Sequence, residues 1–256
     1  MRYLRILYKT PLFILLGVLS YVVLAGCDAL KFDHARKSRN IDWLYDSCMW
    51  LLGIKCRYVG ELAPGPALVV ANHCSHIDVL MLSSLGEMFF TPKSEVKTWP
   101  FIGPLISRFN VIYVDRTPAR TKEIQQNLFA KLASGGRICV FPEATTSDGR
   151  GLLPFKSSLF SLAEQWPGQE PLPIQPVTVV YKRVNGQPIN DATWPKVAWY
   201  GEIDIVRHLL SMFTLRRIEA EVIVHPPIAL QPGETRKQLC ARAQTSVASV
   251  YPYGDK

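Results

Sequence analysis

The feature that most constrains this chain is a run of seventeen residues without a charge, residues 11–27. Arg2, Arg5 and Lys9 precede the run, and the basic stretch KFDHARKSRN follows closely behind it. As a helix, the run reaches only the lower limit of the roughly 17 to 25 residues that span a bilayer. The sequence LAGC also resembles a lipoprotein-processing site at Cys27. Basic residues on both sides favour instead a membrane-embedded hairpin or a short tilted anchor, with an uncleaved N-terminus.

A hairpin needs a second apolar element, and residues 41–56 provide one. Trp43 and Trp50 are seven residues apart, so they share one face of a helix. A helix packed in the protein core would show the same periodicity. We interpret residues 1–57 as a membrane-anchoring helical unit, because two tryptophans on one face suit a membrane interface.

After the turn-forming stretch APGP at residues 63–66, strand-length apolar runs alternate with helix-length runs. This alternation predicts an α/β fold over residues 58–256, with a mixed, largely parallel sheet flanked by helices. The expected strands are residues 67–70, 88–91, 111–114, 138–141, 174–181 and 219–225. The expected helices are residues 77–85, 101–109, 119–132, 157–165 and 234–250.

The composition restricts the partners and the compartment. Hydrophobic residues make up 48% of the 256 residues, which is enough for a sizeable core, and the formal net charge is +8. Such a charge attracts a protein to nucleic acid, acidic lipid headgroups or phosphorylated substrates, and by itself it does not choose among them. The six cysteines have neither the close pairs of a zinc site nor the density of a disulfide scaffold, which indicates a reducing compartment.

The polar stretch NHCSHID, residues 72–78, lies between an expected strand and an expected helix. In open α/β sheets, the turn after a strand is the usual place for a site. A capping box, with Ser75 as the N-cap and Asp78 three residues later, would explain two of these residues without any catalysis. It would leave Asn72 and His73 unexplained.

His73 and Asp78 are five residues apart, which is about 140° around one continuous helix, so they meet only if His73 lies in the turn. There the carboxylate would accept a hydrogen bond from one ring nitrogen, fix the tautomer and leave the other nitrogen as a base. His76 suggests a metal pair with His73, but no further ligand pattern accompanies it. The chain has no G-x-S-x-G nucleophile elbow, so Ser75 has little support as a nucleophile.

Five motifs occur in a fixed order along the chain: NHCSHID at 72–78, KSE…WPFIG at 93–103, VIYVDR at 111–116, FPEATTS at 141–147 and LPIQPV at 172–177. Together they resemble the glycerolipid acyltransferase family, the 1-acylglycerol-3-phosphate acyltransferases and their relatives. With the apolar N-terminal part, the resemblance covers nearly the whole chain. Such enzymes move an acyl group from a thioester to a hydroxyl, which requires a base, an oxyanion site and a clamp on the acceptor.

The resemblance implies a role for particular residues. His73 would be the general base, acting on the acceptor hydroxyl without an acyl-enzyme, and Asp78 would orient it. The family gives no support to Cys74 as a nucleophile. The residues implied to hold the acceptor headgroup are Lys93, Arg116, Glu143 and Thr145. Neither a metal nor a bound cofactor is needed for this chemistry.

Two residues depart from the family pattern. Ala144 stands where the family usually has glycine, which predicts a negative φ and a subtly changed turn. Thr146 stands where many phosphatidic-acid-forming members have arginine, which weakens the case for a phosphate-bearing acceptor. The continuation TSDGRGLLPFKSSLF is similar to the branch that includes lyso-ornithine lipid acyltransferases.

We therefore expect a membrane-bound O-acyltransferase at the inner membrane, with its catalytic domain facing the cytoplasm. It would transfer a fatty acyl group from acyl-CoA or acyl-carrier protein to a lysolipid hydroxyl, and no nucleic-acid partner is expected. The favoured acceptor is 1-acylglycerol-3-phosphate, which yields phosphatidic acid in phospholipid biosynthesis, and a lyso-ornithine lipid is the alternative. A hypothesis from another class is a non-catalytic lipid-binding protein at the membrane.

Overall fold

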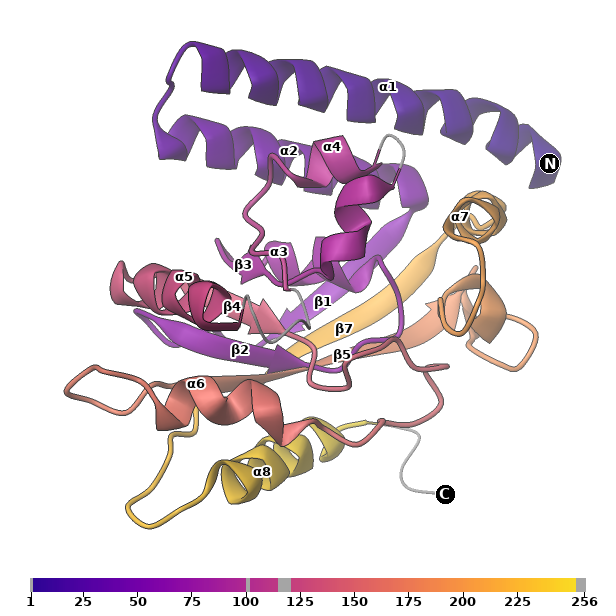
Figure 1. Ribbon diagram of the computed structural model, residues 1–256. Helices are drawn as coiled ribbons and strands as arrows, with labels where there is room; N and C mark the ends of the chain where they lie inside the picture. The colour runs from indigo at the N-terminus through magenta and orange to yellow at the C-terminus, as the bar shows by residue number, and fades with distance from the viewer. Residues whose placement is uncertain (1, 100–101, 115–120, 252–256) are drawn as a thin grey trace.

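The computed structural model describes residues 2–99, 102–114 and 121–251 (Figure 1). Within these ranges the strands form one seven-stranded sheet in the order β1-β7-β5-β2-β4-β3, with β6 paired to β5. The strands are β1 Ile54–Val59, β2 Ala67–Ala71, β3 Phe89–Phe90, β4 Arg137–Val140, β5 Ile174–Val184, β6 Gln187–Pro188 and β7 Ile218–Val224.

The sheet is mixed and largely parallel, which confirms the predicted fold class. β2 runs parallel to both of its neighbours, β4 and β5, and β3 runs parallel to β4. β7 is antiparallel to β5, and β1 is parallel to β7. Because β2, β3 and β4 run the same way, their carboxyl ends meet at one edge of the sheet, which is where ligands bind in folds of this class.

Helices cover both faces of the sheet (Figure 1). The α-helices are α1 Arg2–Ala29, α2 His34–Leu52, α3 Asp78–Ser83, α4 Ile102–Ile106, α5 Thr121–Ala133, α6 Ser161–Glu164, α7 Ile205–Phe213 and α8 Arg236–Ala248. The two cores follow the alternation of β2, whose successive side chains point to opposite faces. Val69 packs with residues of α3 and α7, whereas Leu68 and Val70 pack with residues of α5, α6 and α8.

Two sequence expectations are wrong between residues 41 and 59. The helix expected to reach residue 56 ends at Leu52, and the next residues form β1, which was not expected. The reason is Gly53, whose φ of 74° ends α2 in the left-handed conformation. A Cβ at this position would lie 2.3 Å from the carbonyl oxygen of Arg216, so only glycine fits. The division of the chain at residue 57 stays a prediction, although β1 begins before it.

Other differences are local. The strand expected at residues 111–114 makes only isolated bridges, Val111 to Phe90 and Val114 to Lys93. Helix α7 was not expected. The expected helices at 101–109 and 119–132 begin at positions outside the described residues, and their described parts contain α4 and α5.

Helix α1 lies along the α/β domain and not apart from it. Near its start, Lys9 Nζ donates a hydrogen bond to the Leu215 carbonyl (3.0 Å), and the Phe13 ring lies 5.6 Å from that of Phe213. Near its end, Leu24 packs with Ile41 and other residues of a small core. One face of α1 is therefore fixed to the protein at both ends.

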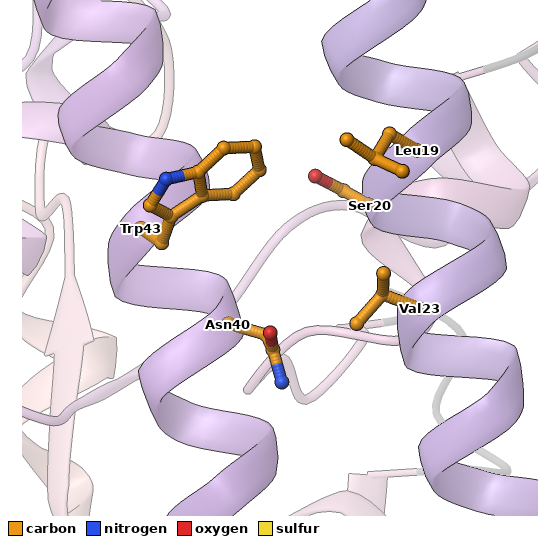
Figure 2. A pocket seen from close by; sticks show the side chains of 5 residues that line it. All are labelled: Leu19, Ser20, Val23, Asn40 and Trp43. Carbon is orange, nitrogen blue, oxygen red and sulfur yellow. The ribbon is translucent and has the colours of Figure 1, made fainter.

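The opposite face of α1 is exposed and apolar. Its large exposed side chains include Leu4, Leu7, Ile14, Leu15, Val18 and Val22. Among the described residues, the segment Tyr3–Ala29 is the one helix long and apolar enough to cross a membrane. An uninterrupted apolar face of this length suits lipid better than water, which indicates a membrane-associated protein. Beside this face, a cavity separates α1 from the antiparallel helix α2 (Figure 2).

Candidate active site

Asn72 explains how the chain leaves β2. Its side-chain Nδ2 donates to the Val179 carbonyl (2.9 Å), and the Val179 N–H donates to Asn72 Oδ1 (2.7 Å). The amide side chain thus takes both hydrogen bonds of a β5 residue just beyond the end of the parallel ladder. Asn72 is buried, so an apolar replacement would leave two backbone groups unpaired. The main chain from His73 onward is released from the sheet into the turn.

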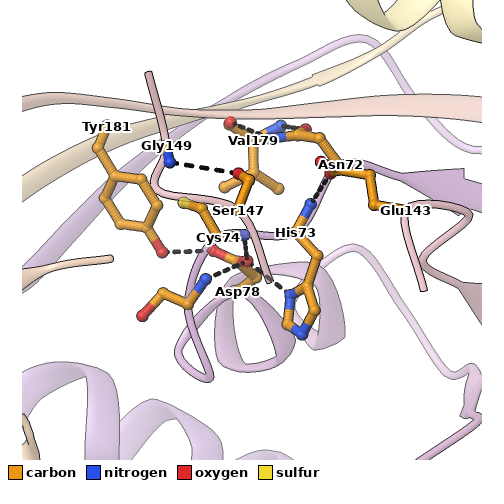
Figure 3. Close-up of polar contacts among 10 residues, drawn as sticks. Asn72, His73, Cys74, Asp78, Glu143, Ser147, Gly149, Val179 and Tyr181 are labelled. Carbon is orange, nitrogen blue, oxygen red and sulfur yellow. Dashed lines mark hydrogen bonds and ion pairs between the residues drawn. The ribbon is translucent and has the colours of Figure 1, made fainter. Parts of the chain in front are cut away.

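His73 and Asp78 meet in that turn (Figure 3). His73 Nδ1 lies 2.9 Å from Asp78 Oδ2, the His73 side chain is 17% exposed, and the Asp78 side chain is fully buried. The same Oδ2 accepts hydrogen bonds from the backbone N–H groups of Cys74 and Ser75, both at 2.9 Å. The turn is therefore wrapped around one carboxylate oxygen.

These contacts fix the tautomer of His73. A backbone N–H can only donate, so Asp78 Oδ2 acts as an acceptor, and His73 Nδ1 must donate its proton to it. The remaining ring nitrogen, Nε2, then carries the lone pair. Phe141 stacks on the imidazole, with ring centroids 3.8 Å apart and planes 12° apart, and holds its orientation. The result is a partly exposed imidazole, fixed in orientation, with its lone pair on Nε2.

Tyr181 completes the carboxylate's environment and was not found from the sequence. Its hydroxyl donates to Asp78 Oδ1 at 2.5 Å across 103 positions of sequence. Burial, followed by the nearby Asp78 charge, raises the pKa of Tyr181 well above its ordinary value, so the hydroxyl keeps its proton. Tyr181 follows Val177 and Val179 on one face of β5, but this alternation indicates only that the residue is buried.

One of the two hydrogen bonds of the expected Ser75–Asp78 capping box is present. Helix α3 begins at Asp78 with Ile77 as its N-cap, and no side chain caps it. The Ser75 N–H does reach the Asp78 carboxylate, but the Ser75 hydroxyl makes no return bond within the described part of the chain. Asp78 therefore serves the turn and His73, and not primarily the helix end.

Glu143 supports the turn from β4. Its Oε1 accepts the His73 N–H at 2.7 Å, and its Oε2 accepts the Leu153 N–H at 2.8 Å. Burial raises the pKa of Glu143 to about 7, against the effect of these two hydrogen bonds. Both carboxylate oxygens are thus directed at the backbone. The predicted contact of Glu143 with the acceptor headgroup stays a prediction.

The expectation for Ala144 is wrong. Its φ is 61°, in the left-handed region, so the turn keeps the conformation that favours glycine. The strain of an alanine there has a local reason: the residue joins buried Glu143 to exposed Thr145, and its own N–H bonds back to the Phe141 carbonyl (3.0 Å). Thr145 is exposed and follows β4, at the same edge of the sheet as His73.

Lys93 lies at this edge but makes no direct contact with the histidine–aspartate pair. It is exposed, follows β3 and precedes the 3-10 helix η1 Ser94–Thr98. The segment with Val114 runs beside it through an isolated bridge. Arg116 lies outside the described residues. The structure thus joins His73, Asp78 and Glu143 by hydrogen bonds, and places Lys93 and Thr145 after neighbouring parallel strands.

Two other titratable side chains of the turn, Cys74 and His76, have pKa values shifted toward their neutral forms by burial. Burial, followed by the Asp78 charge, raises the pKa of Cys74 well above its ordinary value, which leaves a neutral thiol instead of a nucleophilic thiolate. The His76 ring packs edge-on against Trp199 and His208, and burial lowers its pKa to about 3. Over the described ranges, no cluster of three or more metal-ligating side chains occurs.

The oriented imidazole of His73, at the carboxyl edge of a mixed α/β sheet, is suited to take a proton from a hydroxyl. Residues 54–180 match the sequence profile of the family described as Acyltransferase. A lyso-ornithine lipid O-acyltransferase of Brucella abortus (strain 2308) is 32% identical over 227 residues, covering 86% of this chain and 85% of the relative. The chain therefore belongs to this acyltransferase family, and the predicted enzyme class is confirmed.

Two further proteins are similar. A lyso-ornithine lipid O-acyltransferase of Rhizobium meliloti (strain 1021) is 38% identical over 202 residues, covering 77% of this chain and 69% of the relative. The crystal structure of the 1-acyl-sn-glycerophosphate acyltransferase of Thermotoga maritima matches with a TM-score of 0.67 and 19% identity, over 96% of this chain and 95% of that one. The second likeness supports the fold alone.

The positive φ at Ala144 leads to a stability prediction. Ala144→Gly should raise the free energy of unfolding by about 1 kcal/mol, because glycine relieves the left-handed strain at a smaller entropic cost. Denaturant unfolding of the full-length protein in mild detergent would measure it. Ala130→Gly, at an exposed position inside α5, is the matched control and should lower stability by about 0.5–1 kcal/mol. A loss of stability in both variants would contradict the left-handed turn.

Proposed function

We propose that this protein is a membrane-bound O-acyltransferase that esterifies the free hydroxyl of a lyso-ornithine lipid. The observation that carries the acyl-transfer step is the fixed tautomer of His73, which leaves Nε2 as a base. The acceptor is inferred from the relatives named lyso-ornithine lipid O-acyltransferase, which match over most of the chain. Thr146, where many phosphatidic-acid-forming members have arginine, agrees with an acceptor that lacks a phosphate.

The residues present supply a direct transfer. His73 Nε2 removes the proton of the acceptor hydroxyl as its oxygen attacks the carbonyl carbon of the thioester. The tetrahedral intermediate then collapses, the carbon–sulfur bond breaks, and the proton on His73 passes to the departing thiolate. Asp78 stabilises the imidazolium that exists between these steps, since it lies 2.9 Å from the other ring nitrogen. No acyl-enzyme is formed.

The headgroup of the acceptor is assigned to the same edge of the sheet. Lys93 and Arg116 bind its anionic group, which in an ornithine lipid is the amino-acid carboxylate, and Thr145 offers a further hydroxyl. Glu143 acts mainly as a positioning residue, because its two oxygens hold the backbone N–H groups of His73 and Leu153.

The membrane arrangement follows from α1 and the acyl donor. The apolar face of α1 embeds in one leaflet while its other face stays packed on the α/β domain, so α1 does not cross the bilayer. Acyl-carrier protein and acyl-CoA are cytoplasmic donors, which puts His73 on the cytoplasmic side of the inner membrane. The N-terminus is uncleaved, and Cys27 carries no lipid.

A second candidate acceptor is 1-acylglycerol-3-phosphate. It is supported by the cationic residues assigned to the headgroup, which would also bind a phosphate. Both candidates use the same base and differ only in the group that Lys93 and Arg116 would bind.

The proposed function predicts a particular pattern of activity. Vesicles that contain the full-length protein should acylate lyso-ornithine lipid in preference to 1-acylglycerol-3-phosphate when acyl-carrier protein or acyl-CoA is the donor. His73→Ala should reduce turnover by about 10²–10⁴-fold, because general-base catalysis contributes that much. Asp78→Asn should reduce turnover comparably, because the carboxylate that fixes the tautomer is lost.

The assay distinguishes the alternatives. A preference for 1-acylglycerol-3-phosphate would replace the acceptor and keep the mechanism. Near-normal turnover in a folded His73→Ala variant would reject the mechanism. No product from either acceptor with either donor, in protein that is folded and membrane-bound, would favour the non-catalytic lipid-binding protein.

The headgroup assignment predicts an effect on acceptor binding. Lys93→Ala and Arg116→Ala should each raise the acceptor's apparent KM by about tenfold or more, because a charge-assisted hydrogen bond is lost. The donor's KM should change little. Lys122→Ala, which removes an exposed lysine of α5, is the matched control. Equal weakening for donor and acceptor would show that these residues serve the thioester or the fold.

A further inference from the structure

A groove runs between α1 and α2 near the turn that joins them. A cavity of about 330 Å³ is lined by Leu19, Ser20, Val23, Asn40 and Trp43 (Figure 2). A second cavity of about 500 Å³ shares two of these residues, Val23 and Asn40, and therefore adjoins the first. Both volumes lie within the roughly 300–1,000 Å³ that is usual for sites of small ligands.

The inner part of the groove contains an unsatisfied polar group. Ser20 is 3% exposed, and its hydroxyl has no hydrogen-bond partner among the described residues. Figure 2 shows this side chain directed into the space between the helices, toward the Trp43 ring. Trp43 is 48% exposed although it borders the cavity. A buried hydroxyl without a partner costs free energy, which a ligand with an acceptor group would offset.

The outer part of the groove is basic. Arg36 and Arg39 line the second cavity together with the exposed apolar residues Leu30 and Phe32. Arg36 is held over the Phe32 ring, 4.8 Å from its centroid. Across the ranges that the structure describes, neither arginine forms an ion pair with a carboxylate.

Arg36 and Arg39 differ from the neighbouring cations, which form ion pairs with a carboxylate. Lys37 and Arg108 lie close by, and both pair with Asp28, at 2.7 Å and 2.5 Å. Asp28 is thus paired with two other cations, and the nearby Asp33 side chain accepts the backbone N–H of Arg36 at 2.8 Å. The two arginines that border the groove have no carboxylate partner among the described residues.

The position of these cations on α2 is itself unfavourable. Arg36 and Lys37 lie in the first turn of α2, where the helix dipole disfavours cations, although the N-cap residue Asp33 supplies one carboxylate there. Arg39 follows within the next turn. An anion bound at the mouth of the groove would compensate the unpaired guanidinium groups of Arg36 and Arg39.

We propose that the groove binds one acidic diacyl phospholipid of the membrane, in a site separate from the catalytic turn. The phosphate lies between Arg36 and Arg39, and one acyl chain runs along Val23 and Leu19 to Trp43. The ester group of that chain comes within reach of Ser20. A phospholipid fits this arrangement because the groove is basic at its mouth, apolar along its length and continuous with the apolar face of α1. This site goes beyond the proposed acyl transfer and does not depend on it.

Lipid retention tests the site directly. Full-length protein in a neutral detergent is mixed with equal amounts of phosphatidylglycerol and phosphatidylcholine of the same chain length, and native mass spectrometry counts the bound lipids. One phosphatidylglycerol per protein should be retained in preference to phosphatidylcholine. The double variant Arg36→Gln/Arg39→Gln should bind phosphatidylglycerol at least about tenfold more weakly, as the loss of two cations at a lipid surface implies.

Matched variants separate the groove from general charge and from folding. Arg207→Gln/Arg216→Gln removes the same charge from exposed positions outside the groove and should leave retention unchanged. Ser20→Leu, which fills the inner cavity, should reduce retention strongly, whereas Ser20→Ala, which removes only the hydroxyl donor, should reduce it less. Circular dichroism would confirm that each variant is folded.

Several results would overturn the proposal. They are equal retention of the two lipids, equal losses in the two arginine double variants, unchanged retention in Ser20→Leu, and retention of a lysolipid acceptor alone. Acyltransferase activity plays no part in these readouts, so the site and the proposed function fail independently.

Discussion

The buried carboxylate of Asp78 is the interaction on which the active-site region depends. An unpaired buried charge is costly, and here the cost is met by four donors: the His73 ring, two successive backbone N–H groups and the Tyr181 hydroxyl. The donors come from the turn after β2 and from its neighbour β5, so the carboxylate ties the turn to the sheet. Asn72 and Glu143 hold the same turn at its start and from β4.

The turn that contains His73 leads into α3, which packs against the N-terminal helices α1 and α2. Asp78 is the first residue of α3, and α3 packs against α2. Leu80, two residues after Asp78, packs on the small core formed by Leu24, Ile41 and Tyr45 of α1 and α2. Under the proposed function, a lysolipid in the leaflet around α1 would therefore lie close to α3 and to the turn that carries His73.

Much of the sheet and the central pair could be predicted, because they depend on local sequence. Apolar runs located β2, β4 and β5, and the five-residue spacing of His73 and Asp78 required a turn between them. The other features depend on contacts that a sequence does not display. Tyr181 is recognisable only once β5 lies beside β2, β1 is paired with a strand from the end of the chain, and the φ of Ala144 follows from the bonds of its neighbours.

The central claim is that Asp78 holds His73 in one neutral tautomer, and nuclear magnetic resonance of the ring nitrogens tests it most directly. Protein labelled with ¹⁵N-histidine in detergent micelles would be compared with His73→Gln, which identifies the His73 signals by their loss. The account predicts that neutral His73 carries its proton on Nδ1 and leaves Nε2 unprotonated. A proton on Nε2, or an even mixture of the two tautomers, would contradict it.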